Sequence, residues 1–96
     1  MTAERFSKEM GVSHADFYRL LPRAMGDTAY RVEGTTVHGT LQSGTVSIEL
    51  GEQKMRRIAL LGIPYAEVTF SFDGVDESAR TEFMRYFDLR FQRGGG

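Results

Sequence analysis

Residues 28–50, TAYRVEGTTVHGTLQSGTVSIEL, decide the fold because apolar and polar residues alternate along most of their length. Val46, Ile48 and Leu50 are separated by polar residues, as a β-strand with one buried face requires. Two short glycine-containing segments, at residues 34–35 and 42–44, divide the stretch into three such strands. Short turns of this kind connect neighbouring antiparallel strands. The stretch therefore predicts an antiparallel meander with one buried and one wetter face.

The sheet is expected to continue downstream in two further segments. Residues 55–61, MRRIALL, predict one strand in which Ile58 and Leu60 face the core. Residues 62–64 then predict a break, because glycine and proline interrupt a ladder of backbone hydrogen bonds. Residues 67–72 alternate again and predict a last strand.

The strand predicted over residues 55–61 is apolar on both of its faces. If Ile58 points inward, Ala59 and Leu61 point outward beside Arg57. A strand of this kind is either covered on both sides or used for association. We therefore predict that Arg57, Ala59 and Leu61 form an interaction surface for a homodimer or another partner protein. The alternative is that the N-terminal segment folds over them.

A helix is expected before the sheet. Ser13 can cap its N-terminus, and Asp16 three residues later favours the same end. We expect Pro22 to bend this helix and residues 26–27 to end it. Upstream, residues 6–10 are compatible with either an extra edge strand or a short helical turn. An apolar stripe at helical spacing follows the cap, namely Phe17, Leu20, Leu21 and Ala24.

A second helix is expected after the sheet, with Asp76 as its cap. Its apolar stripe consists of Ala79, Phe83, Tyr86, Phe87 and Phe91. The alternation over residues 87–92 also suits a final strand, since Phe87, Leu89 and Phe91 alternate with polar residues. No turn residue separates the two segments, so we favour one continuous helix.

These patterns together predict an α+β fold. It consists of an antiparallel meander of about five strands, with an N-terminal and a C-terminal helix packed on one face. We expect a single domain over residues 1–93 and a flexible glycine tail over residues 94–96. The expected core contains Val32, Val37, Val46, Ile48, Ile58, Leu60, Val68, Phe70 and Phe72 from the strands, and Phe17, Leu20, Leu21, Phe83 and Phe87 from the helices.

Composition narrows the classes of function. The chain has twelve basic and thirteen acidic residues, so it lacks the basic excess that phosphate neutralisation gives a DNA-binding domain. The absence of cysteine excludes disulfides, thiolate metal sites and a cysteine nucleophile. The N-terminus has no signal-peptide core and no run reaches membrane-spanning length. We expect a cytoplasmic protein without a nucleic-acid, membrane or cofactor partner.

Catalytic patterns do not occur among the polar residues: we find no nucleophile elbow and no phosphate-binding loop. We interpret His14 and His38 as surface histidines, and we expect neither a metal site nor an enzyme. A site between helix and sheet is the alternative, in which Arg31 and His38 form a candidate polar site. Tyr18 and Tyr65 are further polar contributors that we consider for it.

The C-terminal residues 89–95, LRFQRGG, resemble the tails of ubiquitin-like proteins and bacterial sulfur carriers, which end in Gly-Gly. The resemblance covers only these residues and implies activation of the tail as an acyl adenylate or thiocarboxylate. It makes Gly94, Gly95 and Gly96 a candidate tail. The predicted order of elements departs from the β-grasp order of those families.

The function that remains by elimination is a small non-enzymatic interaction or accessory protein of the cytoplasm, whose partner is a protein, either itself or another. A small-molecule-binding domain or weak enzyme is the first alternative. A carrier that uses the glycine tail is the second.

Overall fold

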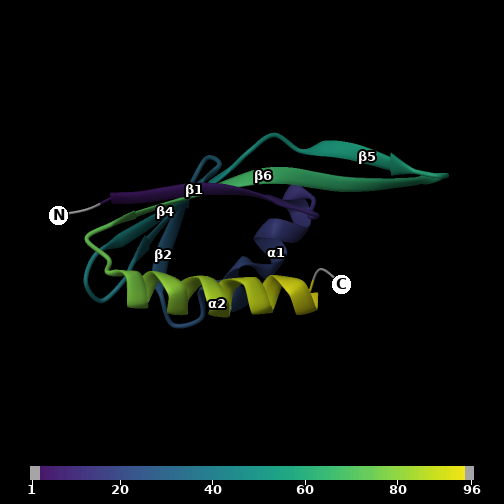
Figure 1. Cartoon of the computed structure of the whole chain (residues 1–96). Coiled ribbons are helices and arrows are strands. Elements are labelled where there is room, and N and C mark those ends of the chain that lie inside the picture. Colours follow the sequence, from purple (N-terminus) through teal and green to yellow (C-terminus); the bar gives the residue numbers. More distant parts are fainter. Residues whose placement is uncertain (1–2, 95–96) are drawn as a thin grey trace.

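A computed structural model describes the backbone of residues 3–94 (Figure 1). The elements follow in the order β1 (Ala3–Met10), α1 (His14–Met25), β2 (Ala29–Glu33), β3 (Thr36–Thr40), β4 (Thr45–Leu50), β5 (Lys54–Ile58), β6 (Leu61–Asp73) and α2 (Glu77–Gly94). All strand pairs are antiparallel, and both helices lie on one side of the sheet. The predicted α+β fold is confirmed, with six strands in this part of the chain.

The order of strands departs from a simple meander at β1. The sheet runs β1-β6-β4-β3-β2, so β6 lies between β4 and the N-terminal strand. The segment 6–10, which the sequence left open, is part of β1, and Phe6 pairs with Phe70. The ring of Phe6 stacks on Phe70 with centroids 5.3 Å apart. Aromatic packing on β6 therefore decides in favour of the strand.

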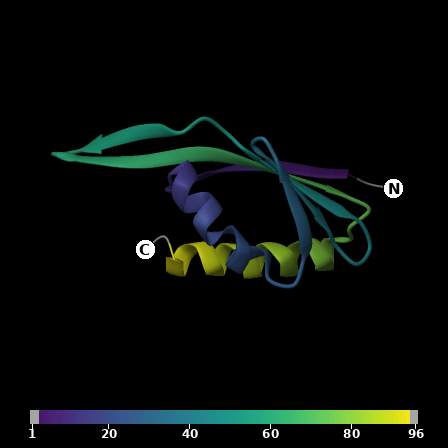
Figure 2. The same ribbon diagram turned by 180° about the vertical axis from the view of Figure 1, so that it is seen from behind.

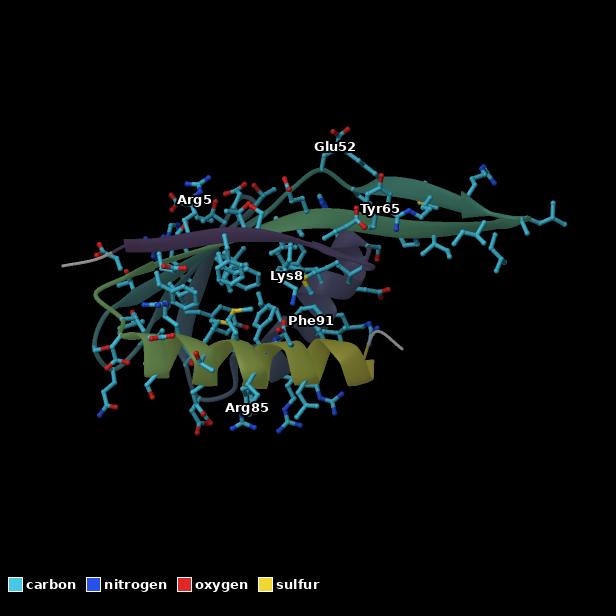
Figure 3. The ribbon with its side chains drawn as sticks, in the orientation of Figure 1. Arg5, Lys8, Glu52, Tyr65, Arg85 and Phe91 are labelled. Carbon is cyan, nitrogen blue, oxygen red and sulfur yellow. The ribbon has the colours of Figure 1, made fainter. Side chains whose placement is uncertain are left out.

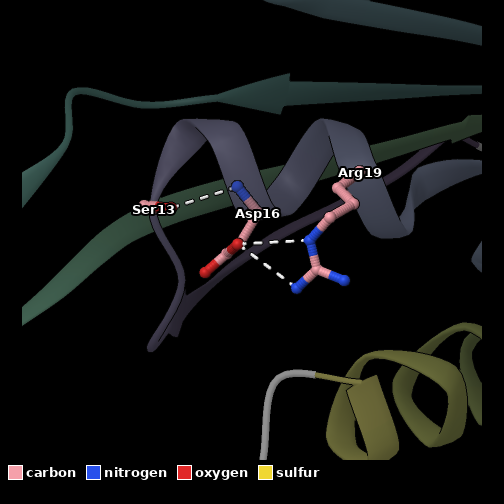
Figure 4. Close-up of polar contacts among 3 residues, drawn as sticks. All are labelled: Ser13, Asp16 and Arg19. Atoms are coloured by element: carbon pink, nitrogen blue, oxygen red, sulfur yellow. Dashed lines mark hydrogen bonds and ion pairs between the residues drawn. The ribbon is translucent and has the colours of Figure 1, made fainter.

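Helix α1 begins and ends where its sequence signals predict. The Ser13 hydroxyl accepts a hydrogen bond from the backbone N–H of Asp16, and the carboxylate of Asp16 pairs with Arg19 one turn later (Figure 4). The helix continues through Pro22 to Met25. Gly26 then adopts a positive φ of 59° and donates its N–H to the carbonyl of Pro22, which closes the helix.

Helix α2 is one continuous helix, so the strand reading of residues 87–92 is wrong. Its N-terminus is capped by Asp76, whose carboxylate accepts from the N–H of Ala79 at 2.8 Å. Phe83, Phe87 and Phe91 lie one turn apart on its buried side. The helical spacing prevails over the strand alternation because each of these rings packs against another aromatic ring in the core.

The core fills the space between the inner face of the sheet and the two helices (Figure 2). All five helix residues of the expected core are buried, as are six of its nine strand residues: Val37, Val46, Ile48, Val68, Phe70 and Phe72. Of the predicted stripe on α2, Tyr86 is exposed. Val32, Ile58 and Leu60 are exposed, and their assignment to the core is wrong. Val32 lies on β2 at the edge of the sheet, whereas the other two lie outside the body of the fold. The core also contains Met10, Val12, Ala24, Met25, Leu50, Ala66, Val75 and Phe91.

The segment predicted as one strand over residues 55–61 is instead a hairpin. Strand β5 ends at Ile58, Ala59 and Leu60 form a two-residue turn, and β6 begins at Leu61. The predicted break at residues 62–64 lies within β6. Ala59 has a φ of 57°, a conformation that glycine or asparagine normally supplies in such a turn. Because Ala-Leu carries no turn signal, a reversal of the chain is not expected here from the sequence.

Candidate functional site

The hairpin projects from the body as a two-stranded arm, which we define as residues 54–65. Strand β1 ends at Met10, opposite Ala66, so β6 has only β5 as a partner beyond that point among the described residues. Figures 1 and 2 show the arm extending past both helices. It makes the molecule 47 Å long but only about half as wide, 24 × 22 Å.

Exposed apolar side chains are concentrated on this arm. Among residues 4–91, whose exposure the structure describes, the arm holds five of the eight exposed large hydrophobic residues: Met55, Ile58, Leu60, Leu61 and Ile63. Leu60, at the turn, exposes 95% of its surface. Scattered single exposures are normal for a folded protein, but a contiguous group is typical of a contact surface.

The arm presents apolar side chains on both faces. Residues paired across a hairpin project to the same side. Ile58 pairs with Leu61 on one face, together with Ile63. Met55 pairs with Pro64 on the other face. The surface therefore wraps around the ribbon.

The predicted surface of Arg57, Ala59 and Leu61 lies in the arm but does not share one face. Arg57 pairs with Gly62 and projects on the side of Met55, while Leu61 projects on the opposite side. Ala59 lies between them in the turn. All three are exposed. The hairpin turn, which sequence reasoning missed, is what separates them.

The charged residues of the arm are all basic. Lys54, Arg56 and Arg57 are basic, and the sequence has no acidic residue between Gln53 and Glu67. Arg56 bonds Glu9 of β1 at 2.9 Å, and its guanidinium lies 4.4 Å from the centre of the Tyr65 ring. The Glu9 carboxylate, through its hydrogen bond and its charge, raises the pKa of Arg56 above its usual value. This contact ties one face of the arm to β1.

The base of the arm is held by His14, at the start of α1. Between β4 and β5 the chain forms a bulge, in which Gly51 still donates its N–H to Glu67 of β6. The ring Nε2 of His14 donates to the carbonyl of Gly51 at 2.7 Å, since a carbonyl can only accept. The side chain of Gln53 in turn accepts from the backbone N–H of His14 at 2.8 Å.

His14 is therefore a structural link and not merely a surface histidine. Its partners lie 37 and 39 residues away in the sequence, and no local pattern could have identified them. The two hydrogen bonds join the helix N-terminus to the point where the arm leaves the sheet. Glu52, in the same bulge, points away from the body (Figure 3).

The predicted polar site is formed in part. Arg31 and His38 are cross-strand partners on the outer face of the sheet. Both contact one oxygen of Glu33, at 3.0 Å from Arg31 and 3.4 Å from His38. The hydrogen bond and charge of Arg31 lower the pKa of the Glu33 carboxyl. The cluster borders an open depression of about 420 Å³ that also includes Thr45 and Ser47.

The other two polar contributors lie elsewhere. The hydroxyl of Tyr18 donates to the carbonyl of Gly34 at 3.3 Å, and Tyr65 stands in the arm beside Arg56. The four residues considered for a site between helix and sheet therefore do not converge.

A different cleft lies between the C-terminus of α1 and helix α2. It has a volume of about 390 Å³ and a mainly apolar lining that includes Met25, Leu41 and Phe83. The hydroxyl-bearing ring of Tyr86 closes one side, against Gly26. The cleft contains none of the polar residues that we considered from the sequence.

Three further observations concern the rest of the described chain. Among residues 3–94 we find no group of three or more histidine and carboxylate side chains placed to hold a metal ion. No helix in this range has the length and apolar character needed to cross a membrane. Of the candidate tail, Gly94 is the last residue of α2, and Gly95 and Gly96 lie outside the described residues.

Comparison with known proteins supplies no relative. No protein-family model, curated protein or solved structure matches this chain.

Proposed function

We propose that the protein is a non-enzymatic interaction module that contacts its partner through the arm. The observation that carries this proposal is the concentration of exposed apolar side chains on residues 54–65, outside a core that is complete without them. Burying one leucine or isoleucine side chain on association contributes about 1.5–3 kcal/mol. The fold gains little of this free energy by itself, because the arm packs on neither helix over most of its length.

The turn of the arm adds support. A non-glycine residue with positive φ costs on the order of 1–3 kcal/mol and such residues cluster at functional sites. Ala59 has this conformation next to the most exposed leucine in the arm. The tip is thus held in a tight, strained turn and carries an apolar side chain where a polar turn residue is usual.

Site-specific photocross-linking tests the proposal. A photoreactive amino acid replaces Leu60 in one variant and Leu89, an exposed leucine on α2, in a matched control. We expect cross-linked products in extracts from position 60, and far fewer from position 89. Equal labelling at both positions, or none at position 60, would contradict an arm-mediated contact.

The partner of the arm could be a second copy of the same chain, which is the homodimer expected from the sequence. A symmetric contact between two arms brings together two elements that each carry three basic residues and no acidic one, which is unfavourable. Sedimentation at high protein concentration tests it. A monomer whose mass does not change in Leu61→Asp excludes self-association and leaves a different partner.

A second candidate function, binding of a small apolar molecule, is favoured by the cleft between α1 and α2. Its volume falls within the range of roughly 300–1,000 Å³ typical of ligand pockets. Ala79→Trp is expected to fill it. A thermal shift by small apolar compounds that disappears in Ala79→Trp would support this function, and the absence of any shift in the unmodified protein would contradict it.

A further inference from the structure

The residues of the arm are ordered along its axis by their chemistry. The turn and the first pair beyond it are entirely apolar: Ile58, Ala59, Leu60 and Leu61. Arg57 belongs to the second pair and Arg56 to the third. Lys54 pairs with Tyr65 in the fifth. At about 3.3 Å per residue the two arginines therefore lie about 7 and 10 Å behind the turn, and Tyr65 about 17 Å behind it.

From this order we propose that the tip of the arm inserts into the headgroup region of an anionic lipid bilayer. This inference rests on the proposed function, because it names the surface that the arm contacts. Apolar groups of interfacial elements enter about 5–10 Å into the boundary between headgroups and acyl chains. Arginine and lysine stems extend along apolar surface while their charges reach the phosphates. The spacing of the arm matches this division.

The exposure of the tip supports a bilayer over a folded protein. A protein partner with a flat surface covers one face of a hairpin and leaves the rest in water. Ile58 and Leu61 lie on one face of the tip and Leu60 at its end, whereas Met55, on the other face, belongs to the fourth pair and lies behind both arginines. A fluid apolar layer surrounds the turn and the first pair, and it leaves Met55 at the level of the headgroups.

The edges of the arm disfavour a partner that adds a β-strand. Proline cannot donate to a hydrogen-bond ladder, so it interrupts an edge that would otherwise pair. Pro64 occupies this position in the β6 half of the arm, and the β5 half carries all three basic residues. Open edges also limit the depth of insertion, since unpaired backbone groups are not tolerated in hydrocarbon. The tip therefore reaches the interface and does not span the bilayer.

Charge determines which bilayer surface is favoured. The arm has three basic residues and no acidic one, while the rest of the chain has nine basic and thirteen acidic residues. Arg56 is paired with Glu9 of β1, so Arg57 is the basic residue of the arm nearest the tip that is offered to the surface. An anionic surface attracts the arm and repels the remainder, which directs the tip toward the lipid. Each lysine or arginine near such a surface strengthens binding by roughly fivefold at physiological ionic strength.

This proposal departs from the expectation that the protein has no membrane partner. That expectation followed from the lack of a spanning segment in the sequence. Interfacial insertion needs only a few apolar side chains at one point, and the hairpin gathers them there. The contacts of His14 and the Arg56–Glu9 ion pair hold the arm in its extended position before it meets a surface.

Vesicle binding tests the inference. The full chain is floated with vesicles of phosphatidylcholine alone and with vesicles that also contain phosphatidylserine. We expect binding to the phosphatidylserine vesicles that weakens as salt is raised. Leu60→Asp should reduce it tenfold or more, and Arg57→Gln severalfold. The matched controls Leu89→Asp and Arg5→Gln, which change exposed residues outside the arm, should bind like the unmodified protein.

Insertion itself is measured by fluorescence. Because the chain has no cysteine, Leu60→Cys can be labelled at one position with an environment-sensitive dye. The emission should shift to the blue on phosphatidylserine vesicles and be quenched by spin-labelled lipids. The same dye at Leu89→Cys should not respond.

Each contrary outcome overturns the inference. Absence of binding to any vesicle excludes a lipid partner, and binding that survives in Leu60→Asp shows adsorption by charge without insertion. If vesicles fail but cross-linking from position 60 captures a protein in a membrane-free extract, the partner is a protein and the proposed function stands. If both experiments fail, the proposed function fails too.

Discussion

Truncation of a large apolar side chain to alanine should have very different effects on stability in the core and in the arm. Phe87 on α2 is fully buried and contacts the rings of Phe70, Phe83 and Phe91, with centroids 4.7–5.8 Å away. Leu60 in the arm exposes 95% of its surface. The sequence pattern placed both residues in the core, whereas the structure buries only Phe87. Comparing the two variants therefore shows whether the pattern or the structure is right.

The expected magnitudes follow from burial. Phe87→Ala removes a buried ring and leaves a cavity, which typically lowers the free energy of unfolding by about 3–5 kcal/mol. The lost aromatic pairs place the expected loss toward the upper end of that range. Leu60→Ala removes only the small fraction of its area that the fold covers, about 0.1 kcal/mol.

Equilibrium urea unfolding, followed by circular dichroism, measures both values. Phe87→Leu serves as a second core variant if Phe87→Ala does not fold, and it should cost about 1–2 kcal/mol. A loss above about 1 kcal/mol in Leu60→Ala, or below about 1 kcal/mol in Phe87→Ala, would refute this division between core and arm.

The remaining predictions concern the base, the turn and the outer face. His14→Ala removes a hydrogen bond to Gly51 worth about 1 kcal/mol and should speed amide exchange in the arm more than in the core, so a uniform change would contradict its role as a link. Ala59→Gly relieves a positive φ and should slow exchange in the arm by up to about fivefold, whereas faster exchange would show that the turn is not strained. On the outer face, the hydroxyls of Thr36 and Thr35 donate to the Glu49 carboxylate and lower its pKa. Its contribution to stability is therefore present above the ordinary value near 4.5 and is lost as pH falls through the lower folded-state pKa. NMR titration of Thr36→Val should move the Glu49 pKa upward, and an unchanged value would contradict the hydrogen-bond assignment.

Sequence reasoning succeeded where local pattern and tertiary packing agree. The alternation in β3 and β4 correctly assigned Val37, Val46 and Ile48 to the core, and the caps of both helices lie at Ser13 and Asp76. These features depend on neighbours within a few residues, which is the range that a sequence pattern reports.

The errors have identifiable physical causes. Lys8 interrupts the apolar spacing of β1, and the structure uses it in an ion pair with Asp88 of α2 at 2.7 Å, which no local pattern signals. Figure 3 shows Lys8 in the same layer as Phe91, between the sheet and the helix. Val32 has the alternation of a core residue, but its strand lies at the sheet edge.

The sequence directed attention to the segment that contains the candidate site. The apolar excess of residues 55–61 makes this segment unusual, and Arg57, Ala59 and Leu61 lie within the arm. Its form as a projecting hairpin was missed, because the turn at Ala59 has none of the residues that normally reverse a chain. The contact of His14 with the bulge could not be predicted either, because Gly51 lies 37 residues away in the sequence and is brought close only by the fold.

The tip of the arm is the proposed contact element of this protein. The decisive measurement is the fluorescence of a dye at Leu60→Cys, compared with the same dye at Leu89→Cys, in the presence of phosphatidylserine vesicles. We expect a blue shift and quenching by spin-labelled lipids at position 60 alone. An unchanged spectrum at position 60, together with no cross-linked product from that position in extracts, would contradict it.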